Sequence, residues 1–158
     1  MAQTELVQYL VEFHTKRDYY QCHEVLEEVW MLAPVHQRQA YWTALIQIAL
    51  GFYQHRRGNF TGAEKMFSRG LTTLEIPAEQ QAVESLGINC SELICEIRKM
   101  LTLVQGKQPY QNYDFPLTQD LMTLCHDYCR KHQLGEFLQR SDLTNEGLIH
   151  RHLHKHTR

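Results

Sequence analysis

The chain has 158 residues, of which 43% are hydrophobic and 22% are charged, and its formal net charge at pH 7 is −2. This length and balance are typical of one globular domain and argue against extensive disorder. The near-neutral charge gives no reason to expect nucleic acid or an anionic membrane as a partner. The most apolar stretch, residues 40–53, is too short to cross a bilayer and contains Gln47, so it predicts a core helix instead.

The N-terminal residues and the cysteines indicate a cytoplasmic protein. The first 20 residues mix charged and apolar side chains from the third residue on, so we expect no signal peptide. Five cysteines are an odd number for a disulfide framework, and reduced thiols fit their clustering at Cys90/Cys95 and Cys125/Cys129 better. A zinc site that combines Cys125 and Cys129 with His132 is the alternative, although structural zinc usually uses two well-spaced ligand pairs.

Apolar residues recur with helical spacing along the chain, and no segment alternates as a strand does. The pattern predicts a first helix over residues 5–14, a second over 18–31 with Asp18 as N-cap, and a third over 37–57. The third helix is apolar on nearly all sides, so we expect neighbouring helices to cover it all round. Gly58 should end it in the left-handed conformation.

Four further helices are expected, with a loop-like linker at residues 105–116 in the middle of them. They are predicted at residues 62–74, 78–103, 118–132 and 143–153. Thr61 and Glu64 have the spacing of a capping box for the first of these, and Gly87 and Asn89 are positions at which the second can be divided. The predicted fold is all-α: a compact bundle of antiparallel helix pairs around the buried third helix, with six to eight helices.

A polar pair stands out on the second helix. His23 and Glu27 lie one turn apart, at the edge of the apolar arc that ends at Trp30. On the third helix, small and polar residues recur every three or four positions among apolar ones. This stripe consists of Ala44, Gln47, Gly51, His55 and Gly58. Because small residues allow close helix approach and a buried Gln47 needs hydrogen-bond partners, we predict a polar cluster of His23, Glu27 and Gln47 between the two helices.

These segments resemble a known bacterial family. HEVLEEVW (residues 23–30), ALIQIALGFYQHRRGN (residues 44–59) and the following FTGA match, in order and spacing, the motifs of the family catalogued as domain of unknown function 309. Ala44 departs from the glycine that the family pattern would place there. The resemblance covers about residues 13–74 and implies a helical domain, and it brings no activity with it.

The cluster allows four interpretations. His23 and Glu27 could ligate a divalent metal, although HEVLE has Glu27 where a metalloprotease helix has its second histidine. They could act as an acid–base pair of a hydrolase-like enzyme, with Tyr20, Tyr53 or Arg57 binding the substrate. They could line a pocket for a small polar ligand or a protein partner, with Trp30, Tyr53 and His55. Finally, they could form a buried network that fixes the register of the two helices.

We therefore expect a single domain over residues 1–158, with the family core at 13–74 and a helical extension at 106–158 whose histidine-rich end is frayed. The favoured function is a binding or scaffold module without a cofactor, which uses His23, Glu27, Trp30, Gln47, Tyr53 and His55. The alternative is a metal-dependent or acid–base enzyme with His23 and Glu27 as candidate ligands. The expected partner is a small polar ligand or a protein, rather than nucleic acid or a membrane.

Overall fold

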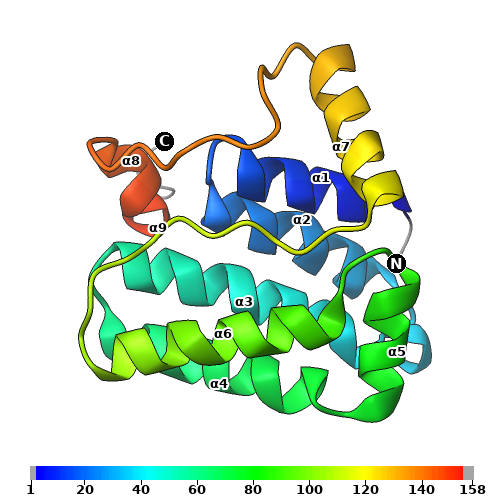
Figure 1. Cartoon of the computed structure of the whole chain (residues 1–158), viewed down its shortest axis with the longest axis horizontal. Coiled ribbons are helices and arrows are strands. Elements are labelled where there is room, and N and C mark those ends of the chain that lie inside the picture. Colours follow the sequence, from blue (N-terminus) through cyan, green and yellow to red (C-terminus); the bar gives the residue numbers. More distant parts are fainter. Residues whose placement is uncertain (1–2, 155–158) are drawn as a thin grey trace.

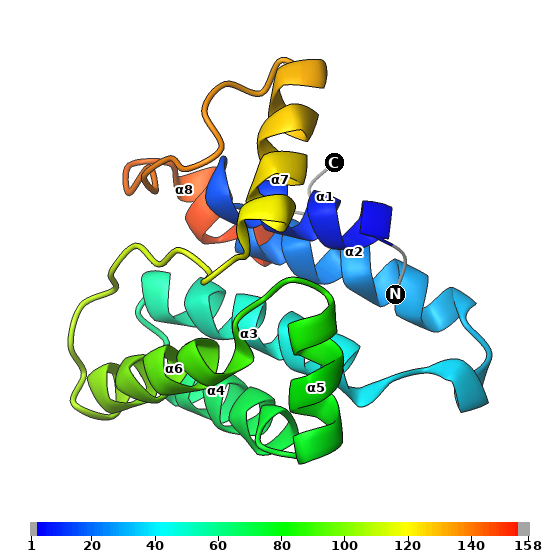
Figure 2. The ribbon, with the colours of Figure 1, turned by 45° about the vertical axis from the view of Figure 1, so that its right-hand side comes forward.

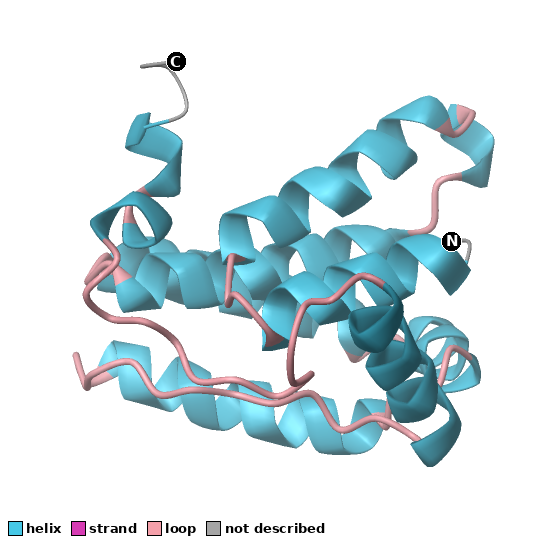
Figure 3. Ribbon diagram, turned by 90° about the horizontal axis from the view of Figure 1, so that it is seen from above, coloured by secondary structure: helices cyan, strands magenta, loops and turns pink. Residues whose placement is uncertain are grey.

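Helices form the regular structure of residues 3–154, the part of the chain that this computed structural model describes, with side chains through residue 153 (Figure 3). The helices are α1 Gln3–His14, α2 Tyr19–Leu32, the 3₁₀ turn η1 Val35–Gln37, α3 Ala40–Arg56, α4 Phe60–Leu74, α5 Pro77–Ser85, α6 Cys90–Gln105, α7 Gln119–Lys131, α8 Glu146–Ile149 and α9 Arg151–His154. The all-α prediction is confirmed. Seven of the helices in this range have nine residues or more, and the helix expected at residues 143–153 is divided into two single turns.

Helix α3 lies in the middle of the bundle, between the pair α1–α2 and the pair α4–α6 (Figure 1). Its buried residues point to all sides of the helix, which is why its sequence shows no polar face. At its C-terminal end Gly58 takes φ = +82°, as its position predicted, and the chain turns directly into α4. The buried central helix of the predicted fold is therefore confirmed.

The small residues of α3 bring it closest to α4. A Cβ atom added at Gly51 would lie 2.5 Å from the ring of Phe67 on α4, so only glycine leaves room for that buried ring. Two turns of α3 away, a Cβ added at Gly70 of α4 would lie 3.4 Å from the backbone oxygen of Ala44. The stripe on α3 thus faces α4, and not α2 as the sequence suggested.

Side-chain caps set several helix starts. Asp18 caps α2 as expected, and Thr118 caps α7; each accepts a backbone N–H of the first turn. Asn89 caps α6 and divides the stretch 78–103 into α5 and α6. The capping box at Thr61 was wrong: Asn59 accepts the N–H of Gly62 at 3.0 Å, so α4 begins earlier, at Phe60.

The connection between α2 and α3 projects from the bundle (Figure 2). Residues 37–39 precede α3 as a 3₁₀ turn and an extended piece rather than as helix, so α3 is shorter than predicted. Met31, Leu32 and Val35 are exposed here by 60%, 80% and 76%. Within residues 3–154, no helix has the combined length and hydropathy that crossing a membrane would require.

The segment after α6 returns over the turn between α1 and α2, and two buried polar side chains hold it there. Nε2 of His14 accepts the N–H of Phe115 at 2.9 Å, so the ring proton is on Nδ1, which donates to the Leu10 oxygen at 2.6 Å. Arg17 is 1% exposed and donates to the backbone oxygen of Tyr113 and, at 2.5 Å, to Asp114. Residues 113–115 are thereby fixed against the corner of α1 and α2.

The contact between Gly51 and Phe67 predicts that replacing this helical glycine by alanine lowers the stability of the protein, whereas the same change usually stabilises a helix. Alanine favours an isolated helix over glycine by about 1 kcal/mol, yet Gly51→Ala should lower the free energy of unfolding by about 1–3 kcal/mol, because the added methyl group overlaps a ring that cannot move. Urea denaturation measures this. Gly106→Ala, where the nearest neighbour of the new Cβ would be the Thr102 oxygen at 3.6 Å, is the neutral control. Equal effects of Gly51→Ala in the wild type and in Phe67→Leu would contradict the overlap.

His14 predicts acid sensitivity. Burial lowers its pKa from 6.5 to about 4, so the unfolded chain binds a proton more readily than the folded one. The corresponding stability, about 3 kcal/mol, is complete above pH 6.5 and is lost as the pH falls toward 4. His14→Gln should be less stable at pH 7 and should lose most of this pH dependence. His36→Gln, at an exposed position, should keep the pH dependence of the wild type. If the free energy of unfolding of the two variants changes equally with pH, His14 is not the source of the acid sensitivity.

Candidate functional site

The predicted pair on α2 forms, but at the surface. Nε2 of His23 lies 2.9 Å from Oε2 of Glu27, and Nδ1 lies 2.7 Å from the backbone oxygen of Tyr20. Both partners are acceptors, so a neutral ring can donate to one of them and a doubly protonated ring to both. The Glu27 side chain is 49% exposed. This is an i, i+4 surface pair, and such pairs contribute little to stability.

Gln47 does not join that pair. Its Oε1 is buried and has no hydrogen-bond partner among residues 3–153. Its Cβ lies 3.8 Å from the position of a Cβ added at Gly70, which places Gln47 on the side of α3 that faces α4. The predicted cluster of His23, Glu27 and Gln47 is therefore wrong in its geometry, because the small residues of α3 select α4 as the close neighbour.

The other candidates lie in three separate environments. The guanidinium of Arg38 stacks on Trp30 at 4.3 Å, at the projecting end of α2. Tyr53 bonds through its hydroxyl to Nδ1 of His152 and accepts the His152 N–H at 3.0 Å. His55 is buried against the linker, where its Nε2 donates to the Gln108 oxygen at 2.8 Å and burial lowers its pKa. They do not line one site.

The residues considered for metal binding are also dispersed. In the described part of the chain no three His, Cys, Asp or Glu side chains are grouped to hold an ion. Cys125 and Cys129 are buried thiols whose pKa values burial raises, that of Cys125 to about 12, which disfavours the thiolate that zinc requires. His150 lies 3.4 Å from Glu146. The His154 side chain and His156, the remaining part of the histidine-rich end, lie outside the described residues.

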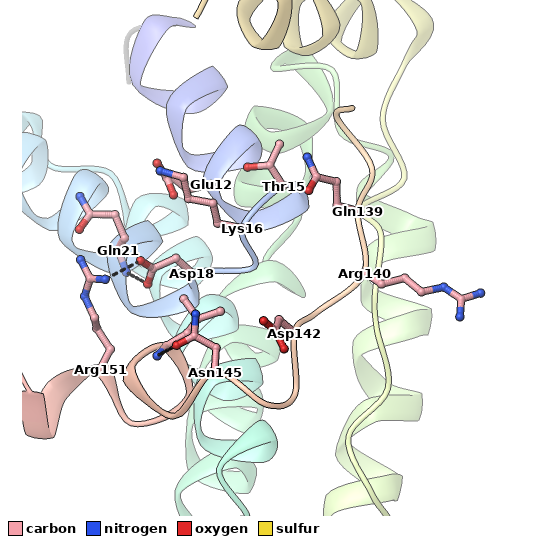
Figure 4. A pocket seen from close by; sticks show the side chains of 11 residues that line it. Glu12, Thr15, Lys16, Asp18, Gln21, Gln139, Arg140, Asp142, Asn145 and Arg151 are labelled. Atoms are coloured by element: carbon pink, nitrogen blue, oxygen red, sulfur yellow. Dashed lines mark hydrogen bonds and ion pairs between the residues drawn. The ribbon is translucent and has the colours of Figure 1, made fainter. Parts of the chain in front are cut away.

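A polar pocket that the sequence did not reveal lies between the α1–α2 corner and residues 139–151 (Figure 4). Its volume is about 610 Å³, and almost all of its lining side chains are polar or charged. One wall comes from α1 and α2, through Glu12, Thr15, Lys16, Asp18 and Gln21, and the other from Gln139, Arg140, Asp142, Asn145, Leu148 and Arg151. The two walls are more than a hundred residues apart in sequence.

Buried cations hold the second wall in place. The guanidinium of Arg56, on α3, stacks at 4.5 Å on the ring of Tyr19. Its Nη1 donates to the Arg17 oxygen at 2.6 Å and to Oγ of Ser141 at 2.9 Å, and its Nη2 donates to the Leu148 oxygen at 3.4 Å. Nε of Arg17 donates to the Gln139 oxygen at 2.7 Å. The pocket wall is thus tied to the bundle by groups that are themselves out of water.

Some of the charged groups in the pocket have protein partners. Asp18 accepts the N–H of Gln21 at 3.1 Å through Oδ1, and its Oδ2 lies 3.1 Å from Arg151. Asp142 accepts both the N–H and the hydroxyl of Thr144, and these bonds lower the pKa of its carboxyl. Both oxygens of Asp18 are therefore occupied, whereas Asp142 is exposed and is bonded through Oδ1 alone, within its own loop.

Glu12 and Lys16 differ from them. Among the described residues, neither side chain makes a hydrogen bond or an ion pair. The Glu12 carboxyl is half-buried, and burial raises its pKa, an effect that the nearby Lys16 and Arg151 only partly oppose. Glu12 lies in the last turn of α1, the exposed Lys16 lies two residues beyond the end of that helix, and both border the pocket (Figure 4). They are the charges in this pocket that a bound molecule could pair with.

Sequence reasoning missed this pocket for identifiable reasons. Glu12 and Lys16 stand next to apolar positions of an amphipathic helix and look like ordinary solvated charges. The only signal in the sequence was the position of Arg17, a cation in the turn between the first two helices. The structure shows that it is buried and takes φ = +53°. A single sequence gives no means of pairing that cation with residues 113 and 139.

Comparison with known proteins gives a family and a relative. The family model described as domain of unknown function 309 matches residues 6–66, which overlap the range expected from the motifs but lie nearer the N terminus. A protein of Bacillus subtilis (strain 168), described as uncharacterized protein YpuF, is 36% identical over 147 residues, which is 92% of this chain and 83% of that protein. No solved structure matches.

The exposure of the His23–Glu27 pair predicts a small effect of its removal. Glu27→Ala should change the free energy of unfolding by less than about 1 kcal/mol, as for other exposed ion pairs, and added salt should reduce the difference. Thermal unfolding at low and high ionic strength measures this. Glu28→Ala, a neighbouring exposed carboxylate, is the matched control. A loss of several kcal/mol in Glu27→Ala alone would mean that the pair is part of a buried network.

Proposed function

The chain belongs to the family described as domain of unknown function 309, and we propose that it is a binding module that takes a small polar molecule into the pocket between the α1–α2 corner and residues 139–151. The observation that carries this proposal is the half-buried Glu12 carboxylate, which borders a cavity and makes no hydrogen bond or ion pair with the described residues. A half-buried carboxylate without a partner destabilises a fold, and a bound donor would remove that cost.

The dimensions and construction of the pocket support this function. A volume of about 610 Å³ falls within the range of small-molecule sites. Its walls come from segments far apart in sequence, and the buried guanidiniums of Arg17 and Arg56 fix them with respect to each other. A pocket held in this way is formed before the ligand arrives, so binding requires little ordering of the protein.

We place the protein in the cytoplasm. All five cysteines are free thiols, and four of them are buried. Uncrosslinked cysteines of this kind fit a reducing compartment.

The proposal is tested by measuring whether small polar compounds stabilise the wild type, and whether a variant with a filled pocket loses this stabilisation. Alanine, succinate, putrescine and glycerol represent four classes of small polar compound, and at 100 times its Kd a true ligand adds about 2.7 kcal/mol of stability. We expect one class to raise the melting temperature of the wild type by several degrees. Scanning fluorimetry measures this shift.

Gln21→Trp is the blocking variant, because its side chain borders the pocket and only its backbone N–H is used by a protein partner. We expect it to abolish the shift. Gln81→Trp, at an exposed position of α5, should leave the shift unchanged. If no class stabilises the wild type, or if Gln21→Trp responds like the wild type, the pocket is not a binding site.

A further inference from the structure

We propose that the ligand of this pocket is a small zwitterion of the α-amino acid type, whose ammonium group pairs with Glu12 and whose carboxylate pairs with Lys16. This inference rests on the proposed function and specifies the chemistry of the molecule that it requires.

The first step is the charge left over in the pocket. Six charged side chains border it, three of each sign: Glu12, Asp18, Asp142, Lys16, Arg140 and Arg151. Asp18 and Arg151 neutralise each other at 3.1 Å, and Oδ1 of Asp142 is held by Thr144. Arg140 points away from the other labelled side chains (Figure 4). Asp142 is exposed and is bonded within its own loop. Glu12 and Lys16 then remain as neighbouring opposite charges that make no hydrogen bond or ion pair among the described residues, although the charge of Lys16 acts on Glu12.

The second step is their spacing. Side chains at i and i+4 of a helix project from the same face, with Cβ atoms about 6 Å apart. Glu12 lies in the last turn of α1 and the exposed Lys16 lies two residues beyond the end of that helix. Their side chains still lie next to each other at the pocket (Figure 4), near enough for the charge of Lys16 to act on Glu12, so their charged ends approach a ligand from the same side. A molecule with an ammonium and a carboxylate on neighbouring atoms can reach both of them. An amine without a carboxylate would pair with Glu12 alone, and a carboxylic acid without an amine would pair with Lys16 alone.

The third step is the effect on Glu12 itself. Burial penalises its charged form, and the opposing effect of Lys16 does not cancel that penalty. An ammonium group brought to within hydrogen-bonding distance would favour the ionised carboxylate and gain from the low dielectric of a partly enclosed site. The free amide of Gln21 and the Nδ2 of Asn145, which makes no hydrogen bond within the described residues, remain for a polar side chain of the ligand.

Isothermal titration calorimetry with three matched probes tests the proposal. Alanine carries both charges, propylamine only the ammonium and propionate only the carboxylate. We expect alanine to bind the wild type at least tenfold more tightly than either of the other two. If propylamine or propionate binds as tightly as alanine, the zwitterion is wrong and the pocket function stands.

Variants locate the two charges. Glu12→Gln and Lys16→Gln should each weaken alanine binding by at least tenfold, while Glu28→Gln and Lys65→Gln, exposed carboxylate and ammonium groups outside the pocket, should not. Glu12→Gln should not be less stable than the wild type at pH 7, since it removes a half-buried charge that lacks a partner. Unchanged alanine binding in either pocket variant would overturn the assignment.

A charge swap provides the final control. The double variant Glu12→Lys with Lys16→Glu presents the same two charges in exchanged positions and should recover most of the alanine binding that each single reversal loses. Failure of the swap to recover binding, with a normal melting temperature, would show that the two residues do not act as a pair on one ligand.

Discussion

The burial of Arg17 is the constraint on which the arrangement of the second half of the chain depends. A guanidinium that is only 1% exposed would cost several kcal/mol in free energy without partners. Its donors are satisfied by the oxygens of Tyr113 and Gln139 and by the carboxylate of Asp114. No residue on α1 or α2 supplies these acceptors, so the linker and the segment after α7 must both come to the α1–α2 corner. The pocket forms where they meet.

The sequence carried enough information for the bundle. A helix that is apolar on nearly all sides must be covered on all sides, and α3 is. What periodicity could not decide was which neighbour comes closest. Gly51 and Gly70 decide it, because each allows the partner helix to approach where a Cβ would overlap or touch it. Helices that carry small residues at matching positions can pack closely, and α2 contains no glycine, alanine or serine.

The site was much less accessible from sequence than the fold. His23 and Glu27 were paired correctly because an i, i+4 relation is local. Gln47 was misplaced because its partners depended on the packing of three helices. Glu12 and Lys16 were not recognised, since what distinguishes them is a lack of partners and an enclosure formed by residues 139–151. Local pairs follow from spacing, whereas a pocket follows from contacts across the whole chain.

The two walls of the pocket depend on the bundle in different ways. Glu12 and Lys16 lie within residues 6–66, in the last turn of α1 and just beyond it, and α1 packs into the core. The opposite wall includes α8 and α9, and helices of four residues are not stable by themselves. Arg56 and Asp18 hold that wall through the Leu148 oxygen and Arg151. The core therefore carries Glu12 and Lys16 and also anchors the opposite wall. Residues 139–151 of that wall limit the size and shape of a molecule that the pocket can hold.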